Sequence, residues 1–340
     1  MPGEFELIAR HFTRPARLTG PTGSTRPARH AAGIELGVGD DCALLRVAPG
    51  MQLAVSSDML VEGRHFLSTV APERLGHKAL AVNLSDLAAC GAAPLAFTLA
   101  LALPRADDHF LAPFAQGLFA LADEHGIELV GGDTTAGPLN ICITVFGQVP
   151  PGQALLRSGA RAGDELWVSG KLGDARLALE VFRGQQALQA MPGDAFEQVR
   201  RAMELPQPRV TLGVALRGLA SAAIDLSDGL LGDLGHVLER SGVGAMVDVD
   251  ALPRSAVLAA QDPAFQHLCL LSGGDDYELL FSAPPRHHGA VQAAGRAAGV
   301  AVTRIGTVLA ADGNAPALRV VDGQGRPVAT PWRGFDHFAA

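Results

Sequence analysis

The sequence predicts a two-domain α/β or α+β protein, from its length, its composition and the alternation of strand-like with helix-like segments. With 340 residues, the chain is long for one core and sufficient for two domains. Hydrophobic residues make up 48% and charged residues 18%, so each domain can bury a core. Strands alternating with helices in both halves indicate sheets covered by helices. We expect domains at 1–150 and 151–340, with Pro150-Pro151-Gly152 as the linker.

Apolar runs and helical periodicity define the elements of the first half. The expected strands are 53–57, which we expect to be buried, 95–103, 127–130, which we expect to end at Gly131-Gly132, and 141–149. The expected helices are 73–92 and 107–125. Residues 14–33 are rich in Pro, Gly, Thr and Arg and contain almost no large apolar residue, which predicts a mobile loop. Its basic side chains could fold over an anion, but a plain solvated loop is the favoured interpretation.

The second half repeats the alternation. Its expected strands are 165–169 and 222–226, and its expected helices are 175–182, 195–204, 210–220 and the stretch after Gly229 as far as Arg240. Further strands and helices lead to a polar, Gly-rich tail.

Charge and composition exclude several classes of function. Lys and Arg total 27 against 35 Asp and Glu, a net charge of −8, so the chain gains no long-range attraction to nucleic acid. The apolar run 95–103 is too short to span a bilayer, and the acidic start at residues 1–6 lacks the apolar stretch of a secretory signal. The four Cys are scattered without a C-x-x-C pair, so we expect free thiols. These features predict a cytoplasmic protein with no nucleic-acid or membrane partner.

One acidic pattern recurs along the chain: an apolar run ends, Gly or Ser follows, and Asp comes next. Its five instances are Val38-Gly39-Asp40-Asp41, Val55-Ser56-Ser57-Asp58, Val130-Gly131-Gly132-Asp133, Ile224 to Gly229 and Leu271 to Asp276. A related case, Asn83-Leu84-Ser85-Asp86, lies within a predicted helix and places Asn83 and Asp86 on one face. Any single instance is usually a turn residue or a helix cap.

The repetition favours a shared site over isolated turns. Strand ends of α/β sheets converge on a crevice, so we expect these carboxylates at strand tips that meet in space. Carboxylates about 5 Å apart repel by about 3 kcal/mol, so a group of them needs a counter-charge, and hard oxygen ligands select Mg²⁺. Gly131-Gly132 would let backbone N–H groups approach a phosphate. The residues thus indicate a multi-metal phosphate site suited to phosphoryl transfer, and they leave the acceptor open.

Other phosphate and metal motifs are missing. Gly170-Lys171 is followed by Leu172, which breaks a P-loop, and the Gly37 to Cys42 stretch lacks the third Gly of a dinucleotide-binding fingerprint. None of the eleven His forms H-E-x-x-H, and no G-x-S-x-G occurs.

The motifs, taken together and in order, resemble the thiamine-monophosphate kinase family over nearly the whole chain. The matching stretches are GVGDDCALL (37–45), KALAVNLSDLAACGAAP (78–94), VGGDTTAGP (130–138), LLRSGARAGDELWVSG (155–170), AIDLSDGLLGDLGH (223–236), LSGGDDYELLF (271–281) and WRGFDHF (332–338). The GDD and GGD motifs alone are shared with the wider aminoimidazole ribonucleotide synthetase superfamily.

The resemblance implies a fold, a reaction and a set of ligands. It implies an aminoimidazole ribonucleotide synthetase-like fold, with an N-terminal ATP- and Mg²⁺-binding domain whose sheet pairs with its twin in a homodimer, and a C-terminal α/β domain. It implies that ATP phosphorylates thiamine monophosphate to thiamine diphosphate directly, without a phospho-enzyme. Several Mg²⁺ ions would serve as cofactors.

Residue roles follow from the matched motifs. The implied metal ligands are Asp41, Ser56, Ser57, Asp58, Asp86, Asp133, Asp225 and Asp228. The implied ATP-binding residues are Gly132, Asp133, Arg157 and Ser227. The implied contacts to thiamine monophosphate are His65, Asp275 and Trp332, whose indole can attract a thiazolium cation. Ser57 stands where the family often has Thr, and Asp275 where it often has Glu, so Asp275 reaches one methylene less far.

Two alternatives remain open at the level of sequence. The first is a sister synthetase of the same superfamily, although no Cys precedes Cys42 and the chain does not end in Cys. The second is a magnesium-nucleotide binding module without catalysis. Turnover that depends on thiamine monophosphate separates the second alternative from a kinase.

Overall fold

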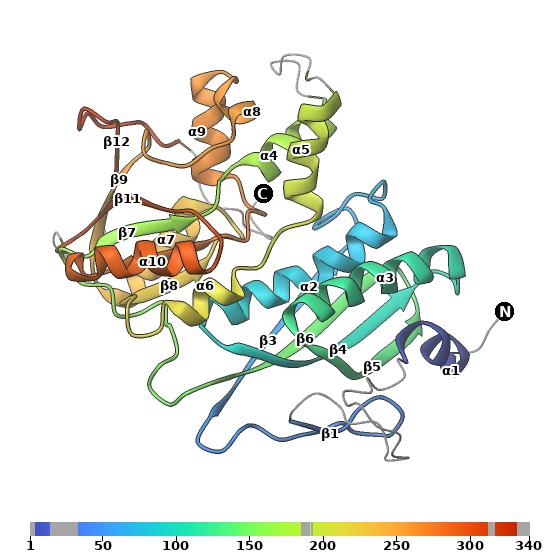
Figure 1. The fold of residues 1–340 in the computed structure, drawn as a ribbon. Helices are drawn as coiled ribbons and strands as arrows, with labels where there is room; N and C mark the ends of the chain where they lie inside the picture. The colour runs from blue at the N-terminus through green and yellow to red at the C-terminus, as the bar shows by residue number, and fades with distance from the viewer. Residues whose placement is uncertain (1–3, 14–32, 185–190, 192, 312–316, 332–340) are drawn as a thin grey trace. The chain divides into compact units, whose positions relative to one another are not determined.

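The fold is seen in a computed structural model that describes residues 4–13, 33–184, 191, 193–311 and 317–331. The chain divides into two compact units (Figure 1). We name residues 1–87 with 92–152 unit 1, and residues 88–91 with 153–340 unit 2. The predicted loop, apart from Gly33, and the predicted substrate residue Trp332 lie outside the described residues.

Unit 1 is built on a four-stranded sheet with the order β3-β6-β4-β5. The strands are β3 (Gln52–Val61), β6 (Asn140–Val149), β4 (Ala93–Leu103) and β5 (Glu128–Ala136). β6 runs antiparallel to both of its neighbours, and β4 and β5 run parallel. All four predicted strands are therefore present in one sheet.

Two of these strands differ from the prediction. The strand expected at 53–57 is not buried, since Leu53, Val55 and Met59 are 46%, 56% and 53% exposed on one face of β3. β5 does not end at Val130 but continues through the two glycines to Ala136. It can do so because Gly132, at φ +145°, has no side chain: a Cβ there would lie 1.8 Å from the carbonyl oxygen of Leu99 on β4.

Two long helices cover one face of this sheet, α2 (Pro72–Ala89) and α3 (Asp108–His125) (Figure 1). Their backbones touch at glycines, because a Cβ on Gly76 would lie 2.0 Å from the carbonyl oxygen of Phe114. Asp107 caps α3 by accepting from the His109 N–H at 2.9 Å. Both helices match their predicted ranges within a few residues.

Short elements complete unit 1. They are α1 (Glu4–Leu7), the π-helical turn η1 (Ile8–Phe12), β1 (Ile34–Leu36) and β2 (Leu44–Leu45). Ile34 of β1 packs with Leu95, Ala96 and Val130 in a small apolar cluster on β4 and β5. The segment between β1 and β2, which holds the GDD motif, is thereby held beside β5.

Unit 2 contains a six-stranded mixed sheet with the order β12-β9-β11-β7-β10-β8. The strands are β12 (Leu318–Val321), β9 (Gly244–Asp248), β11 (Val302–Leu309), β7 (Glu165–Ser169), β10 (Leu279–Ala283) and β8 (Ala222–Asp225). β10 runs antiparallel to β7 and β8 on either side of it. The ends of β7 and β8 therefore lie beside the start of β10.

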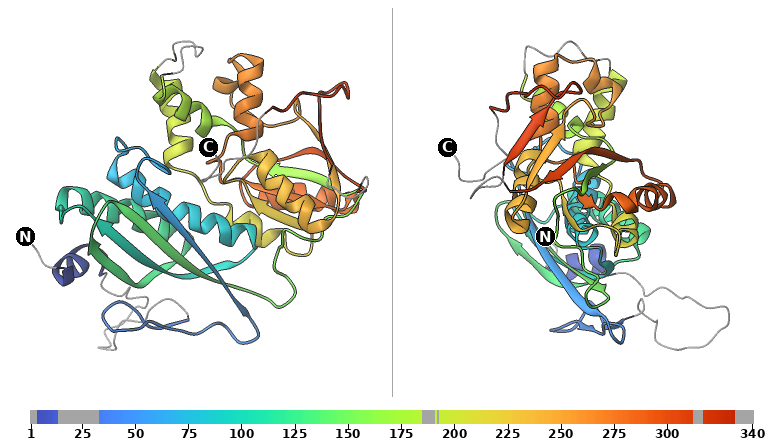
Figure 2. Two further views of the ribbon diagram at one scale, coloured as in Figure 1. Left: turned by 180° about the vertical axis from the view of Figure 1, so that it is seen from behind. Right: turned by 90° about the vertical axis from the view of Figure 1, so that its left-hand side faces the viewer.

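Helices lie on both faces of the unit 2 sheet (Figure 2). Those that share one core are α4 (Asp174–Phe182), α5 (Gly193–Glu204), α7 (Leu230–Ser241), α8 (Ala256–Ala259) and α9 (Pro263–Ser272). The remaining helices are α6 (Val210–Ala215), the 3₁₀ turn η2 (Pro285–His287) and α10 (His288–Ala297). Leu166 and Val168 of β7 face the core, whereas Trp167 between them stacks on Phe281 and meets His288 of α10 edge-on.

The helix expected at 210–220 ends at Ala215. Gly218 adopts a left-handed φ of +71°, which a helix cannot continue through, and residues 216–219 form turns instead. The other predicted strands and helices of unit 2 agree with the structure within two residues.

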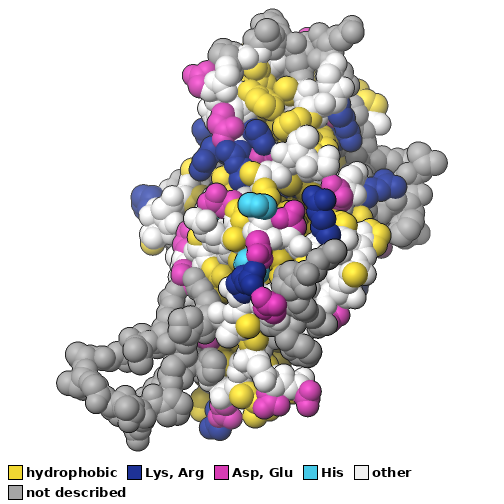
Figure 3. All heavy atoms as spheres, turned by 90° about the vertical axis from the view of Figure 1, so that its right-hand side faces the viewer, with side chains coloured by type: hydrophobic (Ala, Val, Ile, Leu, Met, Phe, Trp, Pro, Cys, Tyr) yellow, Lys and Arg dark blue, Asp and Glu magenta, His cyan; other side chains and the backbone are white. Residues whose placement is uncertain are grey.

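The surface mixes charges. On the face drawn in Figure 3, basic and acidic side chains are interspersed rather than gathered into a basic patch. Within the described residues, no helix combines the length and apolarity needed to cross a membrane.

Candidate functional site

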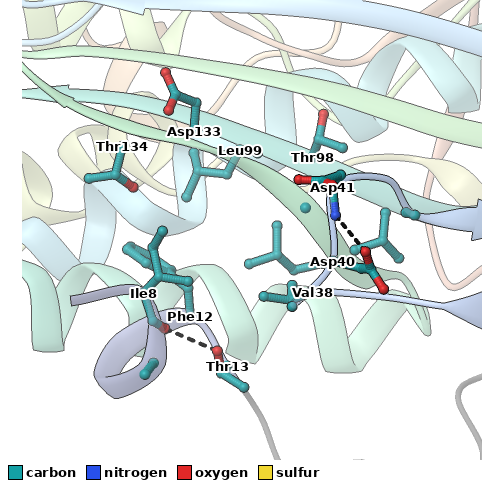
Figure 4. Close-up of a pocket in the computed structure, with 17 residues that line it drawn as sticks. Ile8, Phe12, Thr13, Val38, Asp40, Asp41, Thr98, Leu99, Asp133 and Thr134 are labelled. Atoms are coloured by element: carbon teal, nitrogen blue, oxygen red, sulfur yellow. Dashed lines mark hydrogen bonds between the residues drawn. The ribbon is translucent and has the colours of Figure 1, made fainter. Parts of the chain in front are cut away.

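A pocket of about 620 Å³ in unit 1 brings together two of the predicted acidic motifs. Its walls are η1, residues 38–43, β4 and β5 (Figure 4). Asp41 of the GDD motif and Asp133 of the GGD motif both line it. Ile8 and Phe12 lie across the pocket from Asp133 and supply apolar surface. The pocket therefore combines carboxylate oxygens with an apolar wall.

Three aspartates line this pocket, and the carboxylates of two of them, Asp41 and Asp133, are exposed and available to a ligand. Within the described part of the chain, the side chains of Asp41 and Asp133 take part in no ion pair or hydrogen bond. The Asp41 N–H donates to the neighbouring Asp40 carboxylate at 2.9 Å, which fixes the GDD turn (Figure 4). Gly131 opens the backbone beside them, since a Cβ there would meet nothing nearer than the Thr98 methyl at 4.0 Å.

A second acidic group of unit 1 lies between β3 and α2. The Ser56 hydroxyl donates to the Asp86 carboxylate at 2.5 Å, and the Asp58 N–H donates to the Asn83 side-chain oxygen at 3.0 Å. Asn83 and Asp86 share a helix face, as their i, i+3 spacing predicts. Ser57 points to the opposite face of β3, where its hydroxyl lies 3.0 Å from the Thr144 hydroxyl on β6.

Strand register separates Asp58 from Asp133. Asp58 pairs with Ile143, Ile143 with Leu99, and Leu99 with Gly132, so that Asp133 lies one row further and on the other face. At about 4.8 Å per strand spacing, the backbones of the two Asp residues are about 14 Å apart. Unit 1 thus carries two separate acidic groups, Asp41 with Asp133 and Asp58 with Asp86.

The predicted substrate residue His65 lies in the turn after β3. Its Nδ1 accepts the Val61 N–H at 3.0 Å, so the neutral ring carries its proton on Nε2. Phe66 beside it is buried and fixes the turn. Nε2 is therefore the ring atom of His65 that carries the donor proton.

In unit 2 the predicted residues Ser227 and Asp275 lie side by side. The segment 226–228 extends β8, and the segment 275–277 precedes β10. The Asp275 N–H donates to the Ser227 carbonyl at 2.9 Å, and the Tyr277 N–H donates to the Leu226 carbonyl at 2.8 Å. The DLSD and GGDDY motifs are thus joined by backbone hydrogen bonds.

The GGDDY segment has an unusual backbone. Asp275 and Tyr277 have φ values of +69° and +49°, in the left-handed region that non-glycine residues rarely occupy. Such conformations cost about 1–3 kcal/mol each and persist when surrounding contacts enforce them. The backbone hydrogen bonds to Ser227 and Leu226 hold these two residues, and the next residue, Glu278, is itself held by buried contacts.

Glu278 forms a buried charged network that sequence reasoning missed. Arg209 grips its carboxylate with two N–H groups, one of them from Nε at 2.6 Å, and the Ser169 hydroxyl donates to the same carboxylate at 2.5 Å. Ser169 also accepts the Leu279 N–H at 2.8 Å. Gly170 must lack a side chain, because a Cβ would lie 1.9 Å from the Glu278 carboxylate. The only sign in the sequence is that Glu278 belongs to the motif DDYELLF.

Two further carboxyls, partly buried Asp276 and buried Asp233, support these segments. Burial raises the pKa of Asp276 well above its usual range, and its carboxyl accepts the Gly173 N–H at 2.9 Å. Burial and then the neighbouring charge of Asp228 raise the pKa of Asp233 to about 7. Asp233 accepts the backbone N–H groups of Asp228 and Gly229, each at 3.1 Å, and so fixes the DLSDG turn before α7.

Arg157 lies near this turn. Its positive charge works against the rise in the pKa of Asp233, so the guanidinium lies within electrostatic range of that carboxyl. Its carbonyl accepts from the Ser241 hydroxyl at 3.2 Å. Arg157, Asp228 and Ser227 therefore belong to one neighbourhood of unit 2.

The expectation that all five acidic motifs end strands is wrong. Among them, only Asp225 terminates a strand, β8. Asp58 and Asp133 lie inside β3 and β5, and Asp41 follows an isolated bridge. Asp275 follows helix α9, because the apolar run before it is helical. Gly and Ser next to an apolar run do not stop a strand when neighbouring strands continue to pair with it.

Magnesium fits the donor chemistry of the unit 1 pocket. Mg²⁺ takes one or two carboxylates and completes its shell with phosphate oxygens and waters. The unpaired Asp41 and Asp133 offer two such carboxylates. Across the residues that the structure describes, no three His, Cys, Asp or Glu side chains form a metal-holding group by themselves. A metal in this pocket would therefore need oxygen atoms from its ligand.

The chain matches two known domain families. Residues 39–149 match the AIR synthase related protein, N-terminal domain, and residues 161–318 match the AIR synthase related protein, C-terminal domain. Together these matches cover most of the chain. The chain therefore belongs to the AIR synthase related proteins.

Similarity to individual proteins identifies one family within the AIR synthase related proteins. The chain is 46% identical over 338 residues to a thiamine-monophosphate kinase of Salmonella typhimurium, covering 99% of this chain and 98% of that protein. The crystal structure of thiamine-monophosphate kinase from Stenotrophomonas maltophilia has a TM-score of 0.79 at 45% identity, covering 88% and 93% of the two chains. AaThiL complexed with AMPPCP and TMP has a TM-score of 0.73 at 28% identity, covering 86% and 89%. The chain belongs to the thiamine-monophosphate kinase family.

Proposed function

We propose that this chain is a kinase that transfers the γ-phosphoryl group of ATP to the phosphate of thiamine monophosphate, giving ADP and thiamine diphosphate. Full-length identity to thiamine-monophosphate kinases supports this activity. A related structure holds AMPPCP and TMP together, which supports a ternary complex with both substrates. The same likeness disfavours a sister synthetase.

The observation that carries the proposal is the pair of unpaired carboxylates beside an open glycine backbone. Asp41 and Asp133 share a pocket with Gly131 and Gly132. An isolated polyphosphate would be repelled by these charges, so its binding there requires cations between the two sets of oxygens. A passive structural turn has no need of two exposed acids that face one pocket.

The proposed Mg²⁺ ligands follow from the acidic motifs of each unit. They are Asp41, Ser56, Ser57, Asp58, Asp86 and Asp133 in unit 1, and Asp225 and Asp228 in unit 2. When bound, Mg²⁺ would neutralise charge on the phosphate oxygens as transfer proceeds. For Ser57 the backbone carbonyl is the more suitable donor, because its hydroxyl is turned toward β6.

The remaining roles are binding and orientation. We assign Gly132 and Asp133 of unit 1 and Arg157 and Ser227 of unit 2 to ATP, and His65, Asp275 and Trp332 to thiamine monophosphate. Arg157 can donate a planar pair of N–H groups to a phosphate. The side chains hold the two phosphates in line for direct transfer, and no residue forms a covalent intermediate.

We further propose a cytoplasmic homodimer in which unit 1 supplies the contact. Leu53, Val55 and Met59 form an exposed apolar row on β3, and Leu44 nearby in sequence is 52% exposed. An exposed apolar row of this kind is typical of a protein interface. Size-exclusion chromatography with light scattering on Val55→Asp tests this contact: a monomeric variant supports it, and an unchanged mass contradicts it.

A coupled ADP-release assay tests the activity itself. The protein is incubated with ATP and Mg²⁺, with and without thiamine monophosphate. We expect ADP release that depends on the acceptor and thiamine diphosphate as the product by chromatography. Nucleotide binding without acceptor-dependent turnover would instead indicate a non-catalytic binding module, and turnover with a different phosphorylated acceptor would reassign the substrate.

A further inference from the structure

A second pocket, of about 590 Å³, lies in unit 2 away from all the acidic motifs. Three loops line it: residues 159–164 before β7, residues 218–221 before β8, and residues 284–287 after β10. Its volume is within the range of small-molecule sites. None of the residues assigned above to metal, ATP or thiamine monophosphate lines it.

Strand direction places this pocket at the opposite end of the strands from the acidic residues Asp225 and Asp275 of unit 2. β7 and β8 begin at the pocket, and β10 ends there. Asp225 ends β8, and Glu278 precedes β10, at the other edge. Strands of four and five residues separate the two edges by about 13–17 Å. A ligand in this pocket would therefore not occupy the site of Asp225 and Asp275.

The pocket has a basic lining. Arg161 and Arg286 both line it, both are exposed, and neither guanidinium forms an ion pair with another described residue. His287 lines it as well, and its Nδ1 donates to the Leu219 carbonyl at 2.9 Å, so Nε2 of the neutral ring is an acceptor that can take a hydrogen bond from a protonated phosphate oxygen. Two guanidinium groups and one imidazole ring therefore line the same pocket.

The acid in the lining is already engaged. Asp164 is 4% exposed, and its Oδ2 accepts the Ser221 hydroxyl at 2.6 Å and the Arg161 N–H at 3.0 Å. These contacts turn the carboxylate toward the loop that it stabilises. Its charge is thereby partly compensated, and the lining keeps a net positive charge from the two arginines.

We propose that this pocket binds a small phosphate-containing anion, separately from the kinase reaction. Guanidinium groups match phosphate oxygens with paired N–H donors, and two of them on one pocket favour a phosphate or diphosphate over a neutral ligand. The glycines of the lining leave room for the ligand, because a Cβ at Gly163 or at Gly218 would contact nothing. Binding here needs no divalent metal, unlike binding beside Asp41 and Asp133.

Calorimetric titration of the full chain with inorganic phosphate and with pyrophosphate, in EDTA and at constant ionic strength, tests the site. EDTA removes the metal that the other phosphate site requires. We expect Arg161→Gln and Arg286→Gln each to weaken binding about three- to tenfold, and the double variant to weaken it by about the product of the two. Acceptor-dependent ADP release and the melting temperature should stay unchanged in all three variants.

Two matched variants locate the binding. Arg296→Gln removes an exposed arginine of α10 outside the pocket, and Arg157→Gln removes the proposed ATP contact; both should leave phosphate affinity in EDTA unchanged. The proposal is overturned if the wild-type chain gives no heat of binding up to about 20 mM ligand, because a dissociation constant above that concentration is too weak for a specific site. It is equally overturned if the double variant binds as the wild type does, or if Arg157→Gln abolishes the binding. Since no ATP is present, these results stand apart from the kinase assay.

Discussion

The acidic pocket of unit 1 and the acidic segments of unit 2 use similar residues in opposite environments. Asp41 and Asp133 are exposed, and their side chains form no hydrogen bond or ion pair with other described residues. Around Asp275, by contrast, Glu278 is buried and held by Arg209 and Ser169. The carboxylates of unit 1 are therefore available to a ligand, whereas the buried carboxylate of unit 2 is already paired within the protein.

This difference teaches how the two units divide the work. Exposed carboxylates lose little solvation and can accept a metal with its phosphate, so unit 1 offers charge. A buried carboxylate is stable only with its counter-ion, so Glu278 and Arg209 fix the position of the chain directly after the left-handed residues Asp275 and Tyr277. Substitutions of the exposed carboxylates of unit 1 should therefore lower activity alone, whereas substitutions in the buried Glu278 network of unit 2 should lower stability together with activity.

The largest effect is expected from Glu278→Gln. Breaking a buried ion pair by removing one partner typically costs about 3–5 kcal/mol, and because Arg209 keeps some solvent access we expect about 3 kcal/mol. Unfolding in urea measures the loss. Acceptor-dependent ADP release should also decrease, even when it is measured at temperatures well below the melting temperature of the variant, because Asp275 loses its backbone support.

An exposed pair provides the control for this variant. Glu35 and Arg46 form an ion pair in unit 1 with side chains 46% and 72% exposed. Glu35→Gln should scarcely change stability, because exposed ion pairs usually contribute little to the free energy of unfolding. If Glu278→Gln unfolds at the same urea concentration as Glu35→Gln, the contrast drawn between buried and exposed carboxylates is incorrect.

Asp133→Asn should show the opposite profile. Loss of one group that stabilises transferring charge usually lowers the rate about 100- to 1,000-fold, and we expect that decrease together with a higher Mg²⁺ requirement. The melting temperature should stay within about 2 °C, because surface substitutions usually change stability by under 0.5 kcal/mol. Asp194→Asn, on an exposed carboxylate of α5, is the matched control and should keep full activity. Equal collapse of activity and melting temperature in Asp133→Asn would make Asp133 a structural residue.

Much of the fold could be predicted because periodicity is a local property. The strands of unit 1 and helices α2 and α3 follow directly from apolar spacing. Their ends were harder, since pairing decides them: β5 passes through Gly132 because β4 continues beside it. The predicted burial of β3 was wrong for a related reason: sequence does not reveal which face of a sheet remains uncovered.

The site could be predicted in chemistry and only partly in geometry. Recurring Asp motifs indicated a metal-phosphate site, and Asp41 with Asp133 does share a pocket. The network of Glu278 was missed because its partners Arg209 and Ser169 lie 69 and 109 residues away in the sequence. Contacts at such separation leave no periodic trace, and only the folded sheet brings them together.

Two adjacent glycines offer a finer test of the comparison. Gly132→Ala forces a Cβ to within 1.8 Å of the Leu99 carbonyl at a φ of +145°, so we expect a loss of about 2–3 kcal/mol in stability. Gly131→Ala meets open space and should fold normally. If Gly131→Ala nonetheless weakens ATP binding in a nucleotide titration, its backbone approaches the ligand. Equal stability of the two variants would contradict the close strand contact at Gly132.

The last prediction is a pH slope from Asp233, a change in stability per pH unit rather than a loss at one pH. Burial raises its folded pKa to about 7 from an ordinary value of 3.8, so between those values the folded chain holds a proton that the unfolded chain has lost. Its stabilising contribution is then fully present below about pH 4 and is lost as the pH rises to about 7, at up to about 1.4 kcal/mol per pH unit. Asp233→Asn keeps an oxygen acceptor for the Asp228 and Gly229 N–H groups but cannot titrate. Urea unfolding in EDTA at pH 5, 6 and 7 should give a shallower fall of stability in the variant than in the wild type, whereas Asp194→Asn should keep the wild-type slope. Parallel curves for Asp233→Asn and the wild type would mean that Asp233 is ionised throughout this range, and that the DLSDG turn is as open to solvent as the pocket of unit 1.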